Sequence, residues 1–224
     1  MKILRTMLLS DDVAFAALAR ATSLPNDHAN FHIQQLIKNG YVTKVPKAHG
    51  RYTLTRTGKE YANRMDTDDA QIEKQPKLSV VVIVEREDGL FLQQQRLKQP
   101  YYGFWGHLTG KIRWGETMLE AASRELREET GLTATVRVVG FYHKLDYDEA
   151  DDLLEDKYFC IIHATHPEGE LLIETDGQRN EWLTLEEFEA KEKKFGSVAE
   201  TIAMIRSGRT SVAERRYRYK AEDY

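Results

Sequence analysis

One stretch, residues 110–132, decides how the second half of the chain folds, and it reads GKIRWGETMLEAASRELREETGL. Thr117 followed three residues later by Glu120 is a capping box, a pairing that starts a helix by satisfying its first free backbone N–H groups. Gly131 suits the left-handed backbone that commonly ends a helix. The stretch therefore predicts a helix over residues 117–130, preceded by a short loop.

Three carboxylates lie on one face of this predicted helix. Glu125, Glu128 and Glu129 are spaced i, i+3 and i+4, and residues at those spacings are neighbours on a helix surface. Their charges repel one another, and a divalent cation relieves the repulsion, because Mg²⁺ and Mn²⁺ take hard oxygen ligands and bridge to substrate phosphates. The alternative is a solvated acidic face on which Arg124 and Arg127 pair with neighbouring glutamates.

The same stretch resembles the Nudix box, in which Gly, five residues, Glu and seven residues precede Arg-Glu-aliphatic-x-Glu-Glu-x-Gly-aliphatic. Every fixed position agrees, from Gly110 to Leu132. The resemblance implies a Nudix domain, an α/β/α sandwich around a mixed sheet. It also implies a hydrolase in which water attacks phosphorus in a nucleoside diphosphate linked to another group. The implied cofactor is Mg²⁺ or Mn²⁺, which activates the water and stabilises charge on the bridging oxygen.

The resemblance also implies a role for each matching residue. The carboxylates that it implies as catalytic metal ligands are Glu125, Glu128 and Glu129. Gly110 would contribute its backbone carbonyl to the same ion. Glu116 and Arg124 resemble a pair that braces the loop against the helix.

A further acid is predicted from a later segment. Residues 176–182, DGQRNEW, are similar to Glu-Gly-Gln-Pro-Gly-Glu-Trp in the oxidised-nucleotide hydrolase of the family. This resemblance implies Asp176 as a catalytic acid or distal metal ligand. The acid-rich loop over residues 146–156 offers two rivals, Asp152 and Glu155, and that loop is equally interpretable as a solvated lid.

Four residues are candidates for substrate contact, and each has a structural alternative. Arg96 and Lys111 can pair with phosphates or be solvated on the surface. Phe104 and Trp105 can stack on a nucleobase, or pack in the core. The substrate class stays open, because Leu108-Thr109 stand where many family members have Pro-Gly. Near a position that separates family subclasses stands Tyr147, which hints at dinucleoside polyphosphates.

The first 66 residues predict a second domain. Helical spacing of apolar residues over 2–9, 13–20 and 27–38 precedes two strands, 41–45 and 51–55, and a last helix over 57–65. In the third helix, Phe31, Leu36 and Ile37 can share one buried stripe, and Asn39-Gly40 ends it. This order of elements resembles a winged helix-turn-helix. The fold class is then α+β with two domains.

In winged helix-turn-helix proteins the third helix enters the major groove of DNA and the wing contacts its backbone. Asn and Gln side chains can read adenine edges, and Lys and Arg side chains contact phosphates. The residues predicted to contact duplex DNA are Asn30, Gln34, Gln35, Lys38, Lys47 and Arg51. The alternative is a domain that contacts protein, or forms a homodimer, without DNA.

Charge and composition divide the chain in the same way. Residues 1–66 carry ten Lys/Arg and five Asp/Glu, so +5, and residues 67–224 carry the other 22 and 31, so −9. The predicted domains are residues 1–66 and 78–206, with a polar linker over 67–77. Residues 207–224 are a charged tail, either disordered or a docking segment. The start of the chain lacks a signal-peptide pattern and no apolar run approaches a membrane span, so a cytoplasmic protein is expected.

Within the second domain, the alternation of apolar residues predicts strands and helices around the box. The expected strands are 78–85, 90–94, 134–145, 157–165 and 181–183, and the expected helices after the box are 185–194 and 197–206. Cys160 lies in the apolar run of one of these strands, so a buried, unreactive thiol is expected.

Two functional classes follow. In the first, the protein is a working hydrolase whose winged helix is auxiliary. In the second, it is a transcription regulator whose Nudix domain senses a nucleotide metabolite. In NAD-responsive regulators that fuse these modules the Nudix domain comes first, whereas here the order is reversed. The complete box favours the hydrolase, because a sensor has no need of every metal ligand.

Overall fold

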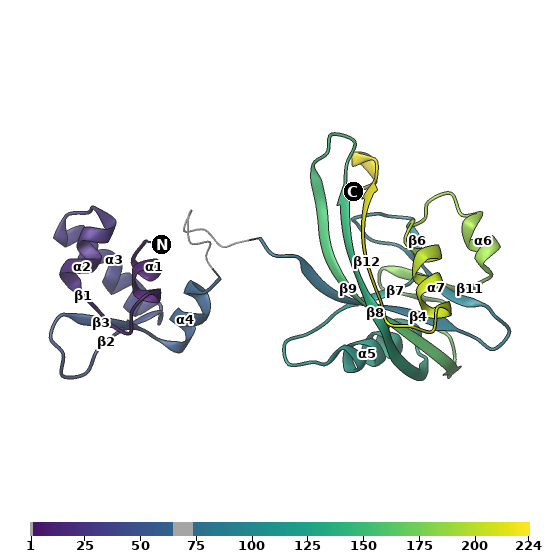
Figure 1. Ribbon diagram of the computed structural model, residues 1–224, viewed down its shortest axis with the longest axis horizontal. Coiled ribbons are helices and arrows are strands. Elements are labelled where there is room, and N and C mark those ends of the chain that lie inside the picture. The colour runs from purple at the N-terminus through teal and green to yellow at the C-terminus, as the bar shows by residue number, and fades with distance from the viewer. Residues whose placement is uncertain (1, 65–73) are drawn as a thin grey trace. The chain divides into compact units, whose positions relative to one another are not determined.

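The computed structural model describes residues 2–64 and 74–224, and the chain divides into two compact units, Met1–Lys74 and Gln75–Tyr224 (Figure 1). Most of the predicted linker lies outside the described residues, and Lys77, its last residue, already belongs to a strand. In the part of the chain that the structure describes, no helix has the length and apolar character needed to cross a membrane.

Over residues 2–64, the first unit contains four helices and a small antiparallel sheet. Its elements are α1 (Lys2–Leu8), β1 (Val13–Ala14), α2 (Phe15–Thr22), α3 (Asn26–Lys38), β2 (Val42–Lys44), β3 (Arg51–Leu54) and α4 (Arg56–Ala62). The strand order is β1-β3-β2. The predicted helices and hairpin are therefore present, and a two-residue strand, β1, joins them.

The core of the first unit corrects one expectation for α3. Ala29 and Ile33 are fully buried on this helix, whereas Phe31 is 59% exposed. Ala29, Ile33 and the partly buried Leu36 follow the i, i+4, i+7 rule for one helix face, and Phe31 falls between them on the other face. The turn after α3 is as predicted, since Gly40 has a φ of 76°, a conformation that glycine adopts without strain.

The second unit is built on one mixed nine-stranded sheet. The main path runs β10-β11-β5-β4-β9-β8-β12, with β6 on β5 and β7 on β4. Its strands are β4 (Lys77–Glu85), β5 (Phe91–Arg96), β6 (Trp105–Gly106), β7 (Leu108–Lys111), β8 (Thr133–Tyr147), β9 (Leu153–Glu168), β10 (Glu174–Thr175), β11 (Gln178–Leu183) and β12 (Ser211–Arg218). The β4–β9 and β8–β12 pairs are parallel and the others antiparallel.

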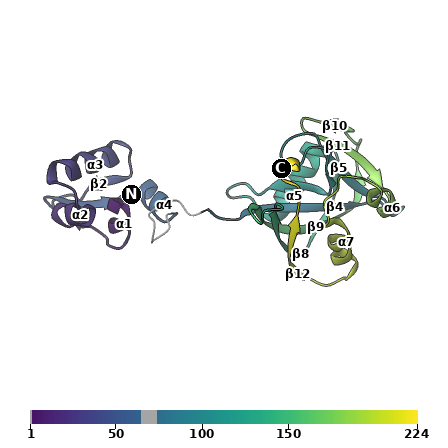
Figure 2. The same ribbon diagram turned by 90° about the horizontal axis from the view of Figure 1, so that it is seen from above.

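Helices cover both faces of this sheet, as Figure 2 shows. They are α5 (Met118–Thr130), α6 (Leu185–Glu189) and α7 (Val198–Arg206), with a 3-10 turn, η1 (Ala221–Asp223), after β12. Alternate residues of β4 point to opposite faces, so Val80 and Val82 pack with α5, and Val81 and Ile83 pack with α6 and α7. The predicted sandwich around a mixed sheet is thus the observed arrangement. Cys160 is buried in the α5 layer.

The segment after residue 206 differs from its prediction as a separate tail. Residues 211–218 form β12 and pair in parallel with β8, from Ser211 opposite Gly140 to Arg218 opposite Tyr147. Ala213 and Tyr217 pack against the core on one side of the strand. Arg216 and Arg218 are exposed on the other side of the strand, because successive residues of a strand point to opposite faces. Arg215 lies on the same side as Ala213 and Tyr217 and forms an ion pair with Glu200 of α7.

Candidate active site

The helix predicted from the central stretch is α5, and its ends are as expected. Thr117 and Glu120 form a reciprocal capping box, and Gly131 ends the helix with a φ of 74°. Ala121, Ala122 and Leu126 are buried against the sheet. Burial of this face fixes the helix, and it sets Glu125 and Glu129 at the edge of the buried surface while Glu128 stays exposed.

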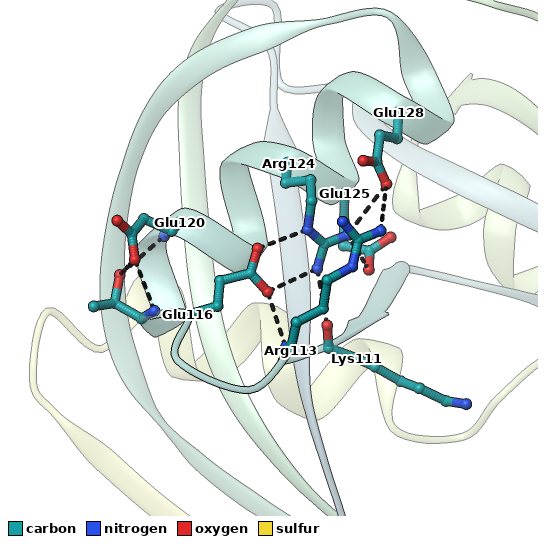
Figure 3. A network of polar contacts seen from close by, with 8 residues as sticks. Lys111, Arg113, Glu116, Glu120, Arg124, Glu125 and Glu128 are labelled. Carbon is teal, nitrogen blue, oxygen red and sulfur yellow. Dashed lines mark hydrogen bonds and ion pairs between the residues drawn. The ribbon is translucent and has the colours of Figure 1, made fainter.

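Arg124 connects the loop before α5 to the carboxylates of the helix, as Figure 3 shows. Its guanidinium donates to Glu116 Oε1 at 2.6 Å, to Glu125 Oε1 at 2.7 Å and to Glu128 Oε2 at 3.2 Å. The hydrogen bonds from Arg124 and from the backbone N–H of Arg113 lower the pKa of Glu116 to about 2. The predicted Glu116–Arg124 brace is therefore a contact in the structure.

Glu125 and Gly110 lie against each other. A Cβ atom added to Gly110 would lie 2.5 Å from Glu125 Oε1, so any larger residue at position 110 would displace this carboxylate. The carboxylate of Glu125 thus lies against the backbone of Gly110, the residue whose carbonyl the resemblance implies as a second ligand. Oxygen donors of this kind suit a hard divalent cation.

Glu129 faces a cleft beside the sheet. Gln94 Nε2 donates to Glu129 Oε2 at 3.3 Å, and Asn180 Nδ2 donates to the Glu129 backbone carbonyl at 2.8 Å. Burial is the largest influence on Glu129 and raises the pKa of its carboxyl, while Gln178 and Gln94 oppose the shift by hydrogen bonding. A carboxylate with a raised pKa in a cleft is a frequent feature of functional sites.

The donor chemistry fits Mg²⁺ or Mn²⁺, but the side chains are not arranged as a finished metal site. Within residues 2–64 and 74–224, no three His, Cys, Asp or Glu side chains form a cluster that could hold a metal ion. Arginines hold two of the α5 carboxylates: Arg124 contacts both Glu125 and Glu128, and Arg113 lies 3.3 Å from Glu128. Glu128 would have to exchange these contacts in order to bind a cation.

Glu125 and Glu129, here called the acidic wall, line a cleft with a volume of about 530 Å³, and three cations, here called the cationic wall, line the same cleft. The cationic wall consists of Arg96, Lys98 and Lys157, which come from β5, the loop after β5, and β9. Burial lowers the pKa of Arg96 and Lys157, and nearby carboxylates oppose that shift. Lys111 is exposed at the rim of the same cleft. Of these cations, sequence reasoning identified Arg96 and Lys111 and missed Lys98 and Lys157.

Glu155 is a buried carboxylate of the cleft, 5% exposed. Burial alone would raise its pKa, but the hydrogen bond from Lys77 Nζ at 2.7 Å and the charge of Lys157 lower it overall. Tyr224 also donates its hydroxyl to Glu155 Oε1 at 3.1 Å. Glu155 is therefore an anion that holds two lysines at the cleft.

The other predicted acids lie on the surface. Asp176 is exposed in the turn between β10 and β11, and Asp152 is exposed before β9. The residue near this turn that lines the cavity beside Glu129 is Gln178, which sequence reasoning did not select. The available signal was the position of Gln178 inside residues 176–182, the segment that the sequence analysis selected for Asp176.

Phe104 and Trp105 are only 5% and 7% exposed, so the structure places both in the core. Phe104 packs edge-on to Tyr101, and Lys191 lies over the Trp105 ring. Near these aromatics the cleft continues into a narrower cavity of about 110 Å³ between the sheet and α7. The cavity and the cleft share Arg96, Lys98, Glu129 and Lys157.

In the first unit, the residues predicted to contact DNA are all exposed. They are Asn30, Gln34, Gln35 and Lys38 on α3, Lys47 in the turn after β2, and Arg51 at the start of β3. Gln34 Nε2 donates to Asn30 Oδ1 at 3.3 Å. Arg51 forms an ion pair with Asp12, so it is less available to a phosphate than Lys47.

Comparison with known proteins identifies a family for the second unit. The NUDIX domain model matches residues 75–203. An ADP-ribose pyrophosphatase of Methanocaldococcus jannaschii is 26% identical over 139 residues, 60% of this chain and 79% of that protein. An octanoyltransferase of Myxococcus xanthus is 27% identical over 165 residues, 70% of this chain, and the chain spans only 46% of its length.

Solved structures share the fold of this unit. The NUDIX domain of Shewanella oneidensis NrtR, determined in complex with ADP ribose, superimposes with a TM-score of 0.52 and 18% identity, covering 69% of this chain and 99% of that one. A MutT protein from Bacillus halodurans gives 0.50 and 23%, covering 66% and 93%. At these identities the likeness concerns the fold alone.

Proposed function

Because the chain belongs to the NUDIX domain family, we propose that its second unit is a metal-dependent hydrolase of diphosphate linkages. The substrate class is a nucleoside diphosphate joined to another group. One observation carries the proposal: two carboxylates of α5, Glu125 and Glu129, line one cleft together with the cations of β5 and β9. A diphosphate needs both, since cations neutralise its charge and carboxylates hold the ions that activate water.

Each wall has a separate task in this reaction. Glu125, Glu129 and the carbonyl of Gly110 would hold Mg²⁺ or Mn²⁺, with Glu128 joining after it leaves Arg113. An ion held there would supply an activated water and stabilise charge on the bridging oxygen. Arg96, Lys98 and Lys157 hold the non-bridging phosphate oxygens and orient the scissile bond.

The brace and the buried acid support these tasks indirectly. Arg124 donates to the Lys111 carbonyl at 3.0 Å as well as to Glu116, which fixes the loop that presents Gly110. Glu155 aims Lys77 and Lys157 at the cleft. Arg124 and Glu155 therefore position other residues of the site and do not contact the substrate, because their own polar atoms are engaged with protein partners.

The test is a phosphate-release screen of the full chain with Mg²⁺ and with Mn²⁺. Its substrates are nucleoside triphosphates, nucleotide sugars, ADP-ribose and dinucleoside polyphosphates, with a phosphatase added to free phosphate from nucleotide products. We expect hydrolysis of at least one class and none after chelation. Absence of hydrolysis by folded protein with both metals would overturn the proposal.

For the first unit, we propose a winged helix-turn-helix that binds duplex DNA. Support comes from the exposed polar side chains of α3, with Gln34 and Gln35 on its surface, and from Lys44 and Lys47 near the β2–β3 turn. The charge of +5 over residues 1–66 favours a polyanionic partner. A regulator that senses a nucleotide through its second unit would combine the two proposals.

The test is an anisotropy titration of the full chain against genomic DNA fragments at two salt concentrations. Phosphate contacts release counterions, so affinity should fall steeply with salt. Lys47→Ala should weaken binding to all sequences alike, whereas Gln34→Ala should relax sequence preference, because base contacts specify and phosphate contacts position. If the full chain does not bind DNA at low salt, either with or without nucleotide, the DNA-binding proposal is overturned and the first unit is a protein-contact domain.

A further inference from the structure

Trp114 stands out on the surface of the second unit. Its side chain is fully exposed, at 105%, the highest exposed fraction of any large apolar side chain in the described residues. It lies in the loop between β7 and α5, where Gly115 turns the chain with a φ of 83°. The folded unit gains no burial from this indole, so its ring is free to contact another molecule.

The surroundings of Trp114 form a shallow groove with a cationic character. The groove is lined by Arg113, Leu119 and Arg127 among others, and Leu119 is 40% exposed. Its two acids are already engaged: Glu116 accepts from Arg124, and Glu120 accepts from Thr117 in the capping box.

The groove adjoins the cleft of the proposed hydrolase at Arg113. Arg113 lines both of them, and its guanidinium reaches Glu128 at 3.3 Å. A ligand that binds its diphosphate between the acidic and cationic walls and extends past Arg113 would therefore meet the Trp114 ring.

We infer that this groove binds a second nucleobase of the substrate, which makes the substrate class a dinucleoside polyphosphate. The inference rests on the proposed function and names its substrate. An indole ring offers a face on which any base can stack, and adjacent arginines neutralise the phosphates that lead to that base. A simple nucleotide sugar would leave the groove empty. The groove would also select substrates by length. Only a substrate with a base at each end can place one base in the narrow cavity and stack the other on the Trp114 ring.

The experiment compares kcat/KM for a dinucleoside tetraphosphate with kcat/KM for a nucleotide sugar of the same nucleoside. Trp114→Ala should lower the ratio of the two by about tenfold, the effect expected from one base–aromatic stack. Trp114→Phe should restore most of the ratio, because it keeps an aromatic face. Tyr102→Ala is the matched control: this exposed aromatic lines neither the groove nor the cleft, and the ratio should not change.

A binding measurement keeps the inference separate from the hydrolase proposal. With Ca²⁺ in place of Mg²⁺, the dinucleoside tetraphosphate should quench the tryptophan fluorescence of the native chain and quench Trp114→Phe far less. Quenching without hydrolysis by any metal would support the groove and overturn the hydrolase. Hydrolysis with an unchanged ratio in Trp114→Ala would overturn the groove alone. The same comparison is made with a 5′-triphosphorylated oligoribonucleotide in place of the dinucleoside tetraphosphate. If Trp114→Ala lowers kcat/KM for the oligoribonucleotide and not for the dinucleoside tetraphosphate, the dinucleoside assignment is overturned in favour of an RNA end.

Discussion

The two walls of the cleft are built in opposite ways. The acidic wall belongs to one helix, in which Glu125 and Glu129 are one turn apart and Arg124 beside them ties the helix to its own preceding loop. The cationic wall is assembled from separate segments, with Arg96 on β5 and Lys157 on β9. One wall is a local structure, and the other exists only when the sheet is complete.

Under the proposed function, this difference would separate chemistry from recognition. Side chains on one helix keep their mutual spacing under most changes elsewhere in the fold, which suits a metal site whose ligands tolerate little displacement. Cations gathered from several strands can be exchanged one at a time without disturbing that helix. Substrate preference can therefore vary while the reaction is kept.

The largest effect is expected for Glu129→Gln in the acidic wall. The change keeps the shape of the side chain and removes its charge, so turnover should fall by a factor on the order of 100 or more. The thermal unfolding midpoint should be unchanged or higher, because burial and the charge of Glu125 both disfavour the ionised carboxyl. Turnover and calorimetry on the same preparation test this, with the exposed Glu192→Gln as control. Normal turnover in Glu129→Gln would refute the metal-ligand assignment.

A smaller effect is expected for Lys157→Met in the cationic wall. Loss of one charge-assisted phosphate contact should raise KM by about tenfold, with a weaker effect on kcat. Glu155 keeps its partners Lys77 and Tyr224, so the fold should survive. Steady-state kinetics of Lys157→Met and Lys157→Arg distinguish loss of charge from loss of packing. An equal fall in kcat with unchanged KM would place Lys157 in the chemical step instead.

A modest effect is expected for Asp176, in the turn between β10 and β11, and for Gln178 at the start of β11. If Asp176 acts as its resemblance implies, Asp176→Asn should lower turnover severalfold, and less than Glu129→Gln. Gln178→Leu removes a hydrogen bond to Glu129 and should raise the pKa of that carboxyl further, which moves the acid limb of the pH–rate profile upward. A silent Asp176→Asn beside a damaging Asp152→Asn would show that the acid comes from the other loop.

The smallest effect concerns His143, which clamps the strand behind the cationic wall. It contacts Asp156 at 2.9 Å and Glu214 at 2.6 Å. Burial lowers the pKa of His143, but these hydrogen bonds outweigh it and the net shift is upward. Its stabilisation is therefore complete below the ordinary histidine pKa and is lost as pH rises through the raised value.

Thermal unfolding at pH 5.5 and pH 9 measures this contribution. The unfolding midpoint should decrease from pH 5.5 to pH 9 in both proteins. The decrease should be larger in the native chain than in His143→Gln, by roughly 1–3 °C if the clamp contributes below about 1 kcal/mol. The partner Glu214 is solvent-exposed, which keeps the effect small. An identical pH dependence in the two proteins would show that the clamp carries no net stability.

The sequence predicts what is local in this molecule. The capping pair Thr117–Glu120 and the spacing of the glutamates predict α5 and its acidic face, because both depend on residues within two turns. The run of β-branched residues over 78–85 likewise predicts β4, whose observed bounds are Lys77–Glu85. The Nudix box identifies the family, a result that the matching of residues 75–203 confirms.

What depends on the completed sheet could not be predicted. Lys98 and Lys157 are ordinary surface lysines until β5, β4 and β9 are placed side by side. Glu155 appeared as one acid among several in a loop, whereas it is a buried residue inside β9. The strand β12 was not predicted, because its sequence is rich in arginine and only Ala213 and Tyr217 pack against the core.

The parallel pairs of the central sheet have a consequence for how the protein is made. Lys77 pairs with Lys157, and Gly140 pairs with Ser211, so each pairing closes a long loop before it gains any stability. Folding rates fall as contacts become less local, and domains form as units while the chain leaves the ribosome. The first unit, whose β2 and β3 meet through a short turn, can fold early. The second must wait with unpaired strand edges until residue 218 has emerged, and during that interval it depends most on chaperones.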